Sequence, residues 1–375
     1  MRVARLVPAA FVYIQGFSLA NLIYLIFFSQ FVDKCGRPLF RVGQLAVLLA
    51  LLIAQYIAFV FHPHAMPLSA IASVLGLLAF AIRADVLFDW DGSAQMREAF
   101  RRVLVWVLVV YVLDSLLRVK YLSMNFTGWS DYELKEQVKT SLWLADDTNT
   151  LTIHVVFLYL ISRSVGLLRA HPWRLRALFI YLSLASYSRA GLAAMLLVVL
   201  VEEAAVRNWL RARYLLPALL MLSGAAMAGL LWLIRNTEID SSVVSKADLV
   251  VGSLAHWVSA DWWRRLFGSG YFSNIDVGIY NWASGHSIIY YGLVDFGAVG
   301  TLLMGTLILR SFRSIQARMV FALYCIMGLS VFRFDLLFLY ITMFFVEHVS
   351  ERRPHGDGRR SGFVSVNHPG VPGGV

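Results

Sequence analysis

Residues 42–61 read VGQLAVLLALLIAQYIAFVF, a run without a single charged side chain. An α-helix rises about 1.5 Å per residue, so a run of about 20 residues spans the roughly 30 Å hydrocarbon core of a bilayer. Similar apolar blocks recur along the 375-residue chain, which is 59% hydrophobic and only 15% charged. A soluble domain is about 45–50% apolar and about 25% charged. The sequence therefore predicts an all-α polytopic integral membrane protein, and it excludes soluble enzymes, disordered chains, collagen-like fibres and disulfide scaffolds.

The apolar blocks predict about 11 (10–12) transmembrane helices within one transmembrane domain, residues 1–350. Two outer segments, 118–148 and 235–293, are too long to be simple turns. The tail, 351–375, is rich in Pro, Gly and Arg and is expected to be disordered and cytoplasmic. We place the spans near residues 8–32, 42–61, 66–82, 103–117, 149–162, 176–186, 190–204, 215–234, 294–309, 318–331 and 335–348.

The net charge of +10 predicts the orientation of the chain rather than nucleic-acid binding. With the tail inside and the spans alternating, most of the 33 basic residues lie in inside loops, while the outer segments are nearly neutral. Arg2 and Arg5 fall outside, against this trend. A single helix across 174–206 would reverse the bias, so the charge pattern favours a break at residues 186–189 that faces outward.

Arg189, at this break, is the first candidate for chemistry. An arginine held between two spans is costly to place, so it usually marks a ligand or a counter-ion, although an interfacial arginine that reaches lipid headgroups is the alternative. His286 is the second candidate, in a polar loop before the span at 294–309. Its imidazole suits proton transfer or donation to a phosphate, or it is a histidine satisfied by backbone. Asp295 could act in catalysis or cap a helix.

The outer segments carry further polar candidates. Cations gathered on one outer surface suit a lipid-linked phosphate or diphosphate, although each alone is an ordinary solvated charge. Acidic and amide side chains before the span at 149–162 could bind sugar hydroxyls or cap that helix. No phosphate-binding GxxxxGK loop is present, so an ATP-driven pump is not expected. The candidate substrate-binding residues are Arg235, Lys246, Arg264 and Arg265 among the cations, Asp146, Asp147 and Asn149 before the span, and Asp295.

Three motifs stand in a fixed order along the chain: SYSRAG (186–191), LFGSG (266–270) and GHSIIYYGLVDFGAVG (285–300). Together with DDTN (146–149), this pattern resembles the O-antigen polymerase and O-antigen ligase superfamily of bacterial surface polysaccharide assembly. The pattern departs from the family at Ser287, where Asn is common, and at Lys246, where Arg is common.

The resemblance implies a GT-C-like glycosyltransferase that works at the periplasmic face of the bacterial inner membrane, without a metal or other cofactor. The donor would be a glycan on undecaprenyl diphosphate, and an acceptor sugar hydroxyl would displace the lipid diphosphate. Arg189 would bind the diphosphate with Arg235 or Lys246 as second cation, and His286 would be the base or a phosphate donor. The implied partners are the lipid-linked oligosaccharide, membrane lipid, a chain-length regulator and a flippase, with no nucleic acid.

The leading hypothesis is a polymerase of O-antigen, capsule or exopolysaccharide. An O-antigen ligase or another lipid-linked oligosaccharide transferase would share the same chemistry. The alternative of a different class is a polysaccharide transporter or flippase, which would place charged residues near the bilayer midplane. A pathway lined by Asp114, Glu202 and Arg333 would favour that alternative.

Overall fold

The structure is a computed structural model, and within the residues that it describes the chain is almost entirely helical. In this part of the chain, the one β contact is an isolated antiparallel bridge between Phe40 and Ile82. The predicted all-α fold is therefore confirmed. The described residues are 40–63, 76–83, 93–125, 144, 148–168, 171–186, 188–206, 241–270, 273, 287–328 and 336–351.

Most of the helices coincide with predicted spans to within a few residues. The helix α6 is longer than the predicted span at both ends, so residues 118–125 continue the helix instead of forming a loop. The predicted spans at 8–32 and 215–234, and most of 66–82, lie outside the described residues. The elements are α3 (Val42–Phe61), α6 (Ala94–Asn125), α8 (Thr148–Ser164), α9 (Pro172–Ala185), α10 (Arg189–Val206), α12 (Ser241–Ser259), α13 (Trp262–Phe267), the π-helix η3 (Tyr290–Asp295), α14 (Gly297–Ser311), α15 (Ile315–Gly328) and α16 (Leu336–Glu351).

Among the described helices, α3 is the one that is both long enough and apolar enough to cross a membrane. Four shorter apolar helices of 10–17 residues accompany it, at 150–164, 297–311, 315–328 and 338–348. The count of about 11 spans stays a prediction.

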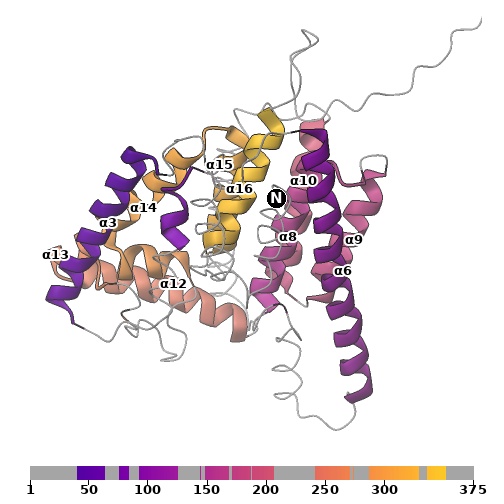
Figure 1. Ribbon diagram of the computed structural model, residues 1–375. Helices are drawn as coiled ribbons and strands as arrows, with labels where there is room; N and C mark the ends of the chain where they lie inside the picture. The colour runs from indigo at the N-terminus through magenta and orange to yellow at the C-terminus, as the bar shows by residue number, and fades with distance from the viewer. Residues whose placement is uncertain are drawn as a thin grey trace, which may run out of the picture.

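The helices form two groups joined by a central pair (Figure 1). One group contains α3, α12, α13, η3 and α14, and the other contains α6, α8, α9 and α10. Between them, α16 packs on both α15 and α8. Aromatic rings fill this junction: Phe338 of α16 packs against Phe157 and His154 of α8 and against Tyr324 of α15. Large buried rings of this kind dominate core energetics, so the two groups share one core.

Two hydrogen bonds join ends of helices that lie far apart in the sequence. The Arg41 guanidinium, before α3, donates to the Ser311 carbonyl at the end of α14 at 2.9 Å. Arg101, near the start of α6, donates from Nε to the Val165 carbonyl just after α8 at 2.6 Å. Each pair joins two ends that the alternation assigns to the same side, the inside.

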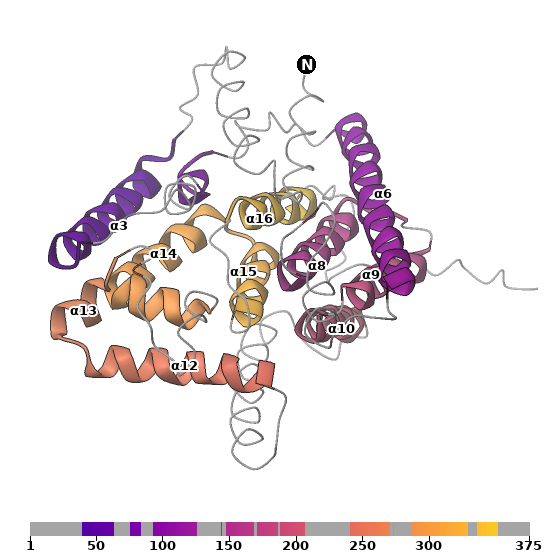
Figure 2. The ribbon, with the colours of Figure 1, turned by 90° about the horizontal axis from the view of Figure 1, so that it is seen from below.

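In the segment predicted as a long outer loop, 235–293, the described residues form the helices α12 and α13 and the start of η3. Of these, α12 lies across one end of the bundle, whereas α6, α8 and α16 run lengthwise (Figure 1). Seen from below, α12 appears along its length while α10 is seen end-on (Figure 2). In both views α12 extends from α13 toward α8 and α10. This transverse helix therefore reaches from one group of helices to the other.

Candidate functional site

The break predicted within SYSRAG is confirmed, because α9 ends at Ala185 and α10 begins at Arg189. Ser188 starts α10: its hydroxyl accepts a hydrogen bond from the Gly191 N–H at 3.2 Å, as an N-cap residue does for the free donors of a first helical turn. Arg189 thus occupies the first helical position of α10. Its side chain is outside what the structure describes.

The break packs against the first turns of α8. The hydroxyls of Ser186 and Thr152 lie 2.6 Å apart, and both side chains are fully buried. At Gly191, an added Cβ would lie 1.9 Å from Cγ2 of Thr152, so only glycine permits this approach. Because Thr152 follows Asn149 by about one turn, the structure brings the backbone of Asn149, the last residue of DDTN, close to the break. The Asn149 side chain, and all of Asp146 and Asp147, lie outside the described residues.

A buried arginine that the sequence did not single out lies at the same break. Arg118 of α6 is only 2% exposed, and its guanidinium donates to the carbonyl of Ala185 in the last turn of α9. Asp114, also buried, stands one helical turn earlier on α6. A buried charge is tolerated when it is paired and hydrogen-bonded. The sequence could have indicated this buried site through the spacing of four residues between Asp114 and Arg118, because residues four apart share one face of a helix.

The second and third family-like motifs meet in what we call the glycine clasp, residues 266–270 and 294–297. The Ser269 N–H donates to the Val294 carbonyl at 2.7 Å, and the Gly270 N–H donates to the Asp295 carbonyl at 3.0 Å. Gly268 and Gly297 have φ values of +78° and +64°. A Cβ on Gly268 would lie 2.1 Å from the Asp295 carbonyl oxygen, and one on Gly297 would lie 2.3 Å from the Gly268 nitrogen. The two backbones touch because neither glycine carries a side chain.

The π-helix η3 leads into the clasp from the side of His286. His286 lies outside the described residues, but Ser287 beside it is buried and accepts a hydrogen bond from the Ile289 N–H at 3.2 Å. The Thr301 hydroxyl of α14 donates to the Gly292 carbonyl within η3. Short π-helical turns occur frequently at functional sites. The segment after the candidate histidine therefore has an unusual geometry that α14 stabilises.

Asp295 does not cap α14. The N-cap of that helix is Phe296, without a side-chain hydrogen bond. The buried Asp295 carboxylate instead accepts a hydrogen bond from the Ser273 hydroxyl at 2.6 Å. It thereby ties residue 273 to the glycine clasp, an arrangement that neither interpretation from the sequence included.

The two arginines of α13 differ in their surroundings. Arg265 is exposed, and its Nε donates to the Ala260 carbonyl at 2.7 Å. Arg264 is partly buried and lies over the Trp263 ring, 5.0 Å from the centroid. Partial burial, and then the charge of Arg264, lower the pKa of His256 on α12. That imidazole therefore favours its neutral form more than a free histidine does.

The remaining predicted cations are placed only in part. Lys246 lies in the second turn of α12, at the end that points toward α8 and α10, but its side chain is outside what the structure describes. Arg235 lies outside the described residues. One end of the transverse helix thus lies beside α13 and the other points toward α8 and α10, while its length packs on η3.

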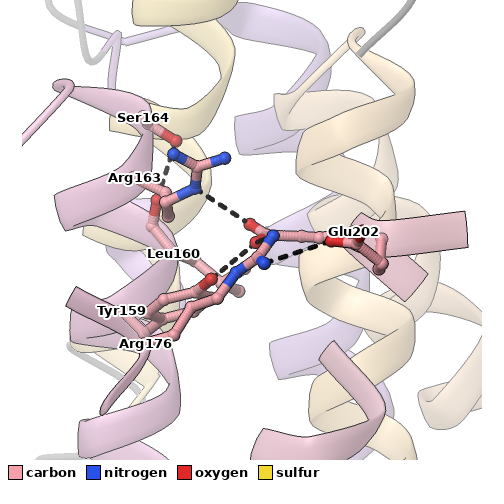
Figure 3. Close-up of polar contacts among 7 residues, drawn as sticks. Tyr159, Leu160, Arg163, Ser164, Arg176 and Glu202 are labelled. Atoms are coloured by element: carbon pink, nitrogen blue, oxygen red, sulfur yellow. Dashed lines mark hydrogen bonds and ion pairs between the residues drawn. The ribbon is translucent and has the colours of Figure 1, made fainter. Parts of the chain in front are cut away.

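A separate charged cluster joins α8, α9 and α10 at the ends that lie away from the SYSRAG break (Figure 3). The Tyr159 hydroxyl donates to Glu202 at 2.5 Å, and Arg163 and Arg176 contact the same carboxylate at 3.4 and 3.7 Å. Arg176 also pairs with Glu203 at 3.1 Å. We call these five residues the Glu202 network. Its two arginines balance its two glutamates.

The Glu202 network bears on the transporter alternative. Asp114 lies near the break, whereas Glu202 lies at the other end of the same helices, beside the last turn of α8. Arg101 of α6 reaches that other end, and Asp114 is 13 residues further along, about 20 Å of helix. Arg333 lies outside the described residues. Glu202 and Asp114 therefore lie at different levels along these helices and not together at one depth.

Within the part of the chain that the structure describes, no group of three or more His, Cys, Asp and Glu side chains could hold a metal ion. Comparisons with protein-family models, with curated proteins and with solved structures find no match to this chain.

Proposed function

We propose that this protein polymerises a bacterial surface polysaccharide at the periplasmic face of the inner membrane, as a GT-C-like member of the O-antigen polymerase and ligase superfamily. One observation carries the proposal: motifs far apart in the sequence meet in pairs. SYSRAG packs on Thr152 in the first turns of α8, a helix that begins within DDTN at Thr148, and LFGSG is joined to residues 294–297. Both pairs lie at the end of the bundle that α12 crosses.

Exposed apolar side chains support insertion into a membrane. Along α3, large residues such as Leu49, Ile53 and Tyr56 are exposed, and α6 exposes Trp106 and Leu113. Contiguous apolar surface of this extent marks an interaction surface in a folded protein. Lipid is the partner that suits helices of about 30 Å, because their apolar sides then face hydrocarbon along the whole length. The proposal retains about 11 spans.

The proposed reaction is a displacement at the anomeric carbon of the donor. The acceptor sugar hydroxyl attacks this carbon, the bond between it and the diphosphate oxygen breaks, and the lipid diphosphate leaves. His286 takes the hydroxyl proton. Arg189, at the start of α10, and Lys246, at the near end of α12, neutralise the charge that develops on the leaving diphosphate. Arg118 is a positioning residue, because its hydrogen bond to Ala185 holds the end of α9 next to the break.

The ligase and the other lipid-linked transferases share this donor chemistry, and only the acceptor separates them from a polymerase. The flippase alternative receives less support, since Asp114 and Glu202 lie at different levels of the bundle and not together at one depth.

The test is an assay with purified protein, a synthetic polyprenyl-diphosphate repeat unit and EDTA, without ATP. We expect longer glycans together with free polyprenyl diphosphate. Transfer to lipid A–core alone would replace the polymerase with a ligase. Movement of intact lipid-linked units across vesicle membranes, without glycan growth, would replace the enzyme with a flippase.

A further inference from the structure

The outward face of α12 is apolar although the helix lies on the surface. Val251, Leu254 and Val258 are 49%, 42% and 59% exposed. Their spacing of three and four residues puts them on one side of the helix. The opposite side, with Leu249 and Ser253, is buried against the protein. Thus one side of α12 is buried against the protein, and the apolar side opposite it is exposed.

The short helix α13 continues this apolar surface. Trp262 is 71% exposed, and Leu266 is also exposed. Between them, Arg264 lies over a tryptophan ring and Arg265 is exposed. Tryptophan beside arginine is typical of the boundary between hydrocarbon and headgroups, where the ring stays in the apolar layer and the guanidinium reaches phosphates.

The end of α3 sets the depth of this surface. The 20 residues of α3 cover about 30 Å, the thickness of the hydrocarbon core. Its last residue, Phe61, packs against Trp263 of α13 with ring centroids 4.9 Å apart. Therefore α13 lies at the level where α3 leaves the hydrocarbon. From there α12 runs across the bundle instead of along it (Figures 1 and 2).

We infer that α12 and α13 form an interfacial platform in the outer leaflet, with phospholipid at the boundary between acyl chains and headgroups covering its apolar face. We define the platform by Val251, Leu254, Ala255, Val258, Trp262 and Leu266. A helix with one apolar exposed side, held parallel to a membrane at this depth, buries that side about 5–10 Å into the boundary. The exposed apolar face of α3 is continuous with the platform through Phe61 and Trp263, so one lipid layer contacts both.

The inference rests on the membrane insertion in the proposed function and deepens it. A platform at headgroup depth puts the ends of α12 at the level of the diphosphate of a lipid-linked donor. Such a donor can then reach Arg189 by lateral diffusion, with its polyprenyl tail still in the bilayer.

The experiment measures depth by spin labelling of the full-length protein in lipid nanodiscs. Both native cysteines, Cys35 and Cys325, are replaced by alanine, and one nitroxide is attached at Leu254→Cys or at Val258→Cys. Collision rates with oxygen, which concentrates in hydrocarbon, and with a water-soluble nickel chelate are compared. Ser259→Cys, an exposed position at the polar edge of α12, is the matched control on the same helix. Ile53→Cys, on the exposed face of α3, is the reference for hydrocarbon.

We expect labels at 254 and 258 to favour oxygen and the label at 259 to favour the nickel chelate. Two positions on the stripe keep the test decisive if one variant fails to fold. Equal nickel collision rates at 254, 258 and 259, with oxygen favoured at 53, would overturn the platform and leave the membrane protein standing. Nickel collisions at 53 as well would overturn the membrane insertion on which both proposals rest.

Discussion

Substitution of Gly297 by alanine tests whether the glycine clasp holds the site together. Gly297 has φ +64°, and a left-handed conformation costs an alanine about 1–2 kcal/mol. The new Cβ would also lie 2.3 Å from the Gly268 nitrogen and 2.6 Å from the Leu266 carbonyl oxygen. Both contacts are with backbone atoms, so the two segments of the clasp, 266–270 and 294–297, must move apart. Overpacking of this kind costs about 1–3 kcal/mol.

The two effects together amount to about 2–5 kcal/mol, a large share of the roughly 5–15 kcal/mol that stabilises a typical domain. An open clasp becomes at least about thirtyfold more populated, since about 1.4 kcal/mol is a factor of ten. Gly305→Ala is the matched control in the same helix, because no atom lies within 4 Å of the position that its new Cβ would take. Alanine there is expected to stabilise α14 by up to about 1 kcal/mol.

The assay combines thermal unfolding of both purified variants in one detergent with glycan length in cells, normalised to the amount of folded protein. We expect Gly297→Ala to unfold at a lower temperature and to make little long-chain glycan. We expect Gly305→Ala to unfold at the same or a slightly higher temperature than the unmodified protein and to make the same amount of glycan. Equal unfolding temperatures and equal glycan for the two variants would refute the role of the clasp.

Three further outcomes are expected. Arg189→Ala should lower polymer formation by about 10²–10³-fold, because it removes one donor to the charge that develops on the diphosphate. Arg189→Lys should retain only part of the activity, because lysine cannot form the bidentate contact of a guanidinium. Full activity of the alanine variant on glycan gels would remove this residue from the mechanism. His286→Ala should lose about 10²–10⁴-fold and accumulate single lipid-linked repeat units on the outer leaflet, whereas a wild-type rate in the purified assay would contradict its role as base. Burial, and then the charge of Arg264, lower the pKa of His256 in the folded protein, so the His256 imidazole binds a proton more readily in the unfolded chain. The free energy of unfolding should therefore fall as the pH drops below about 6.5, the pKa of a free histidine, toward the lowered pKa of the folded state. In thermal unfolding at pH 7 and pH 5, His256→Gln should lose that part of the fall; identical pH dependence in both proteins would contradict this.

The sequence predicted helices best where apolar runs are uninterrupted. The boundaries of α3 agree with the predicted span at 42–61, and the charge pattern located the break before Arg189. The predicted span at 103–117 ended before Arg118, which was placed at the start of an outer segment, whereas α6 continues to Asn125. Arg118 stays within the helix since its guanidinium reaches the Ala185 carbonyl, a partner 67 residues away that no local pattern reveals.

The candidate site was predicted in its parts but not in its assembly. The motif positions follow from the sequence, yet the contact of Gly191 with Thr152 depends on how α8 packs against α10. Likewise, η3 is stabilised by Thr301, and its π geometry has no period that could be recognised beforehand. The helices α12 and α13 were missed because their apolar residues are mixed with polar and charged ones over 235–293.

The Glu202 network also constrains how this protein can move. It fastens α8, α9 and α10 to one another at one end, while Thr152, Ser186 and Gly191 fasten the same helices at the other. Three helices clamped at both ends rotate and translate as a single rigid body. Under the proposed function, we expect release of a lengthening glycan to involve displacement of elements outside that body, such as α12, and hinge motions of this kind belong to the microsecond-to-millisecond range. The rate of product release would accordingly depend on the viscosity of the lipid around α12 more than on the chemistry at the break.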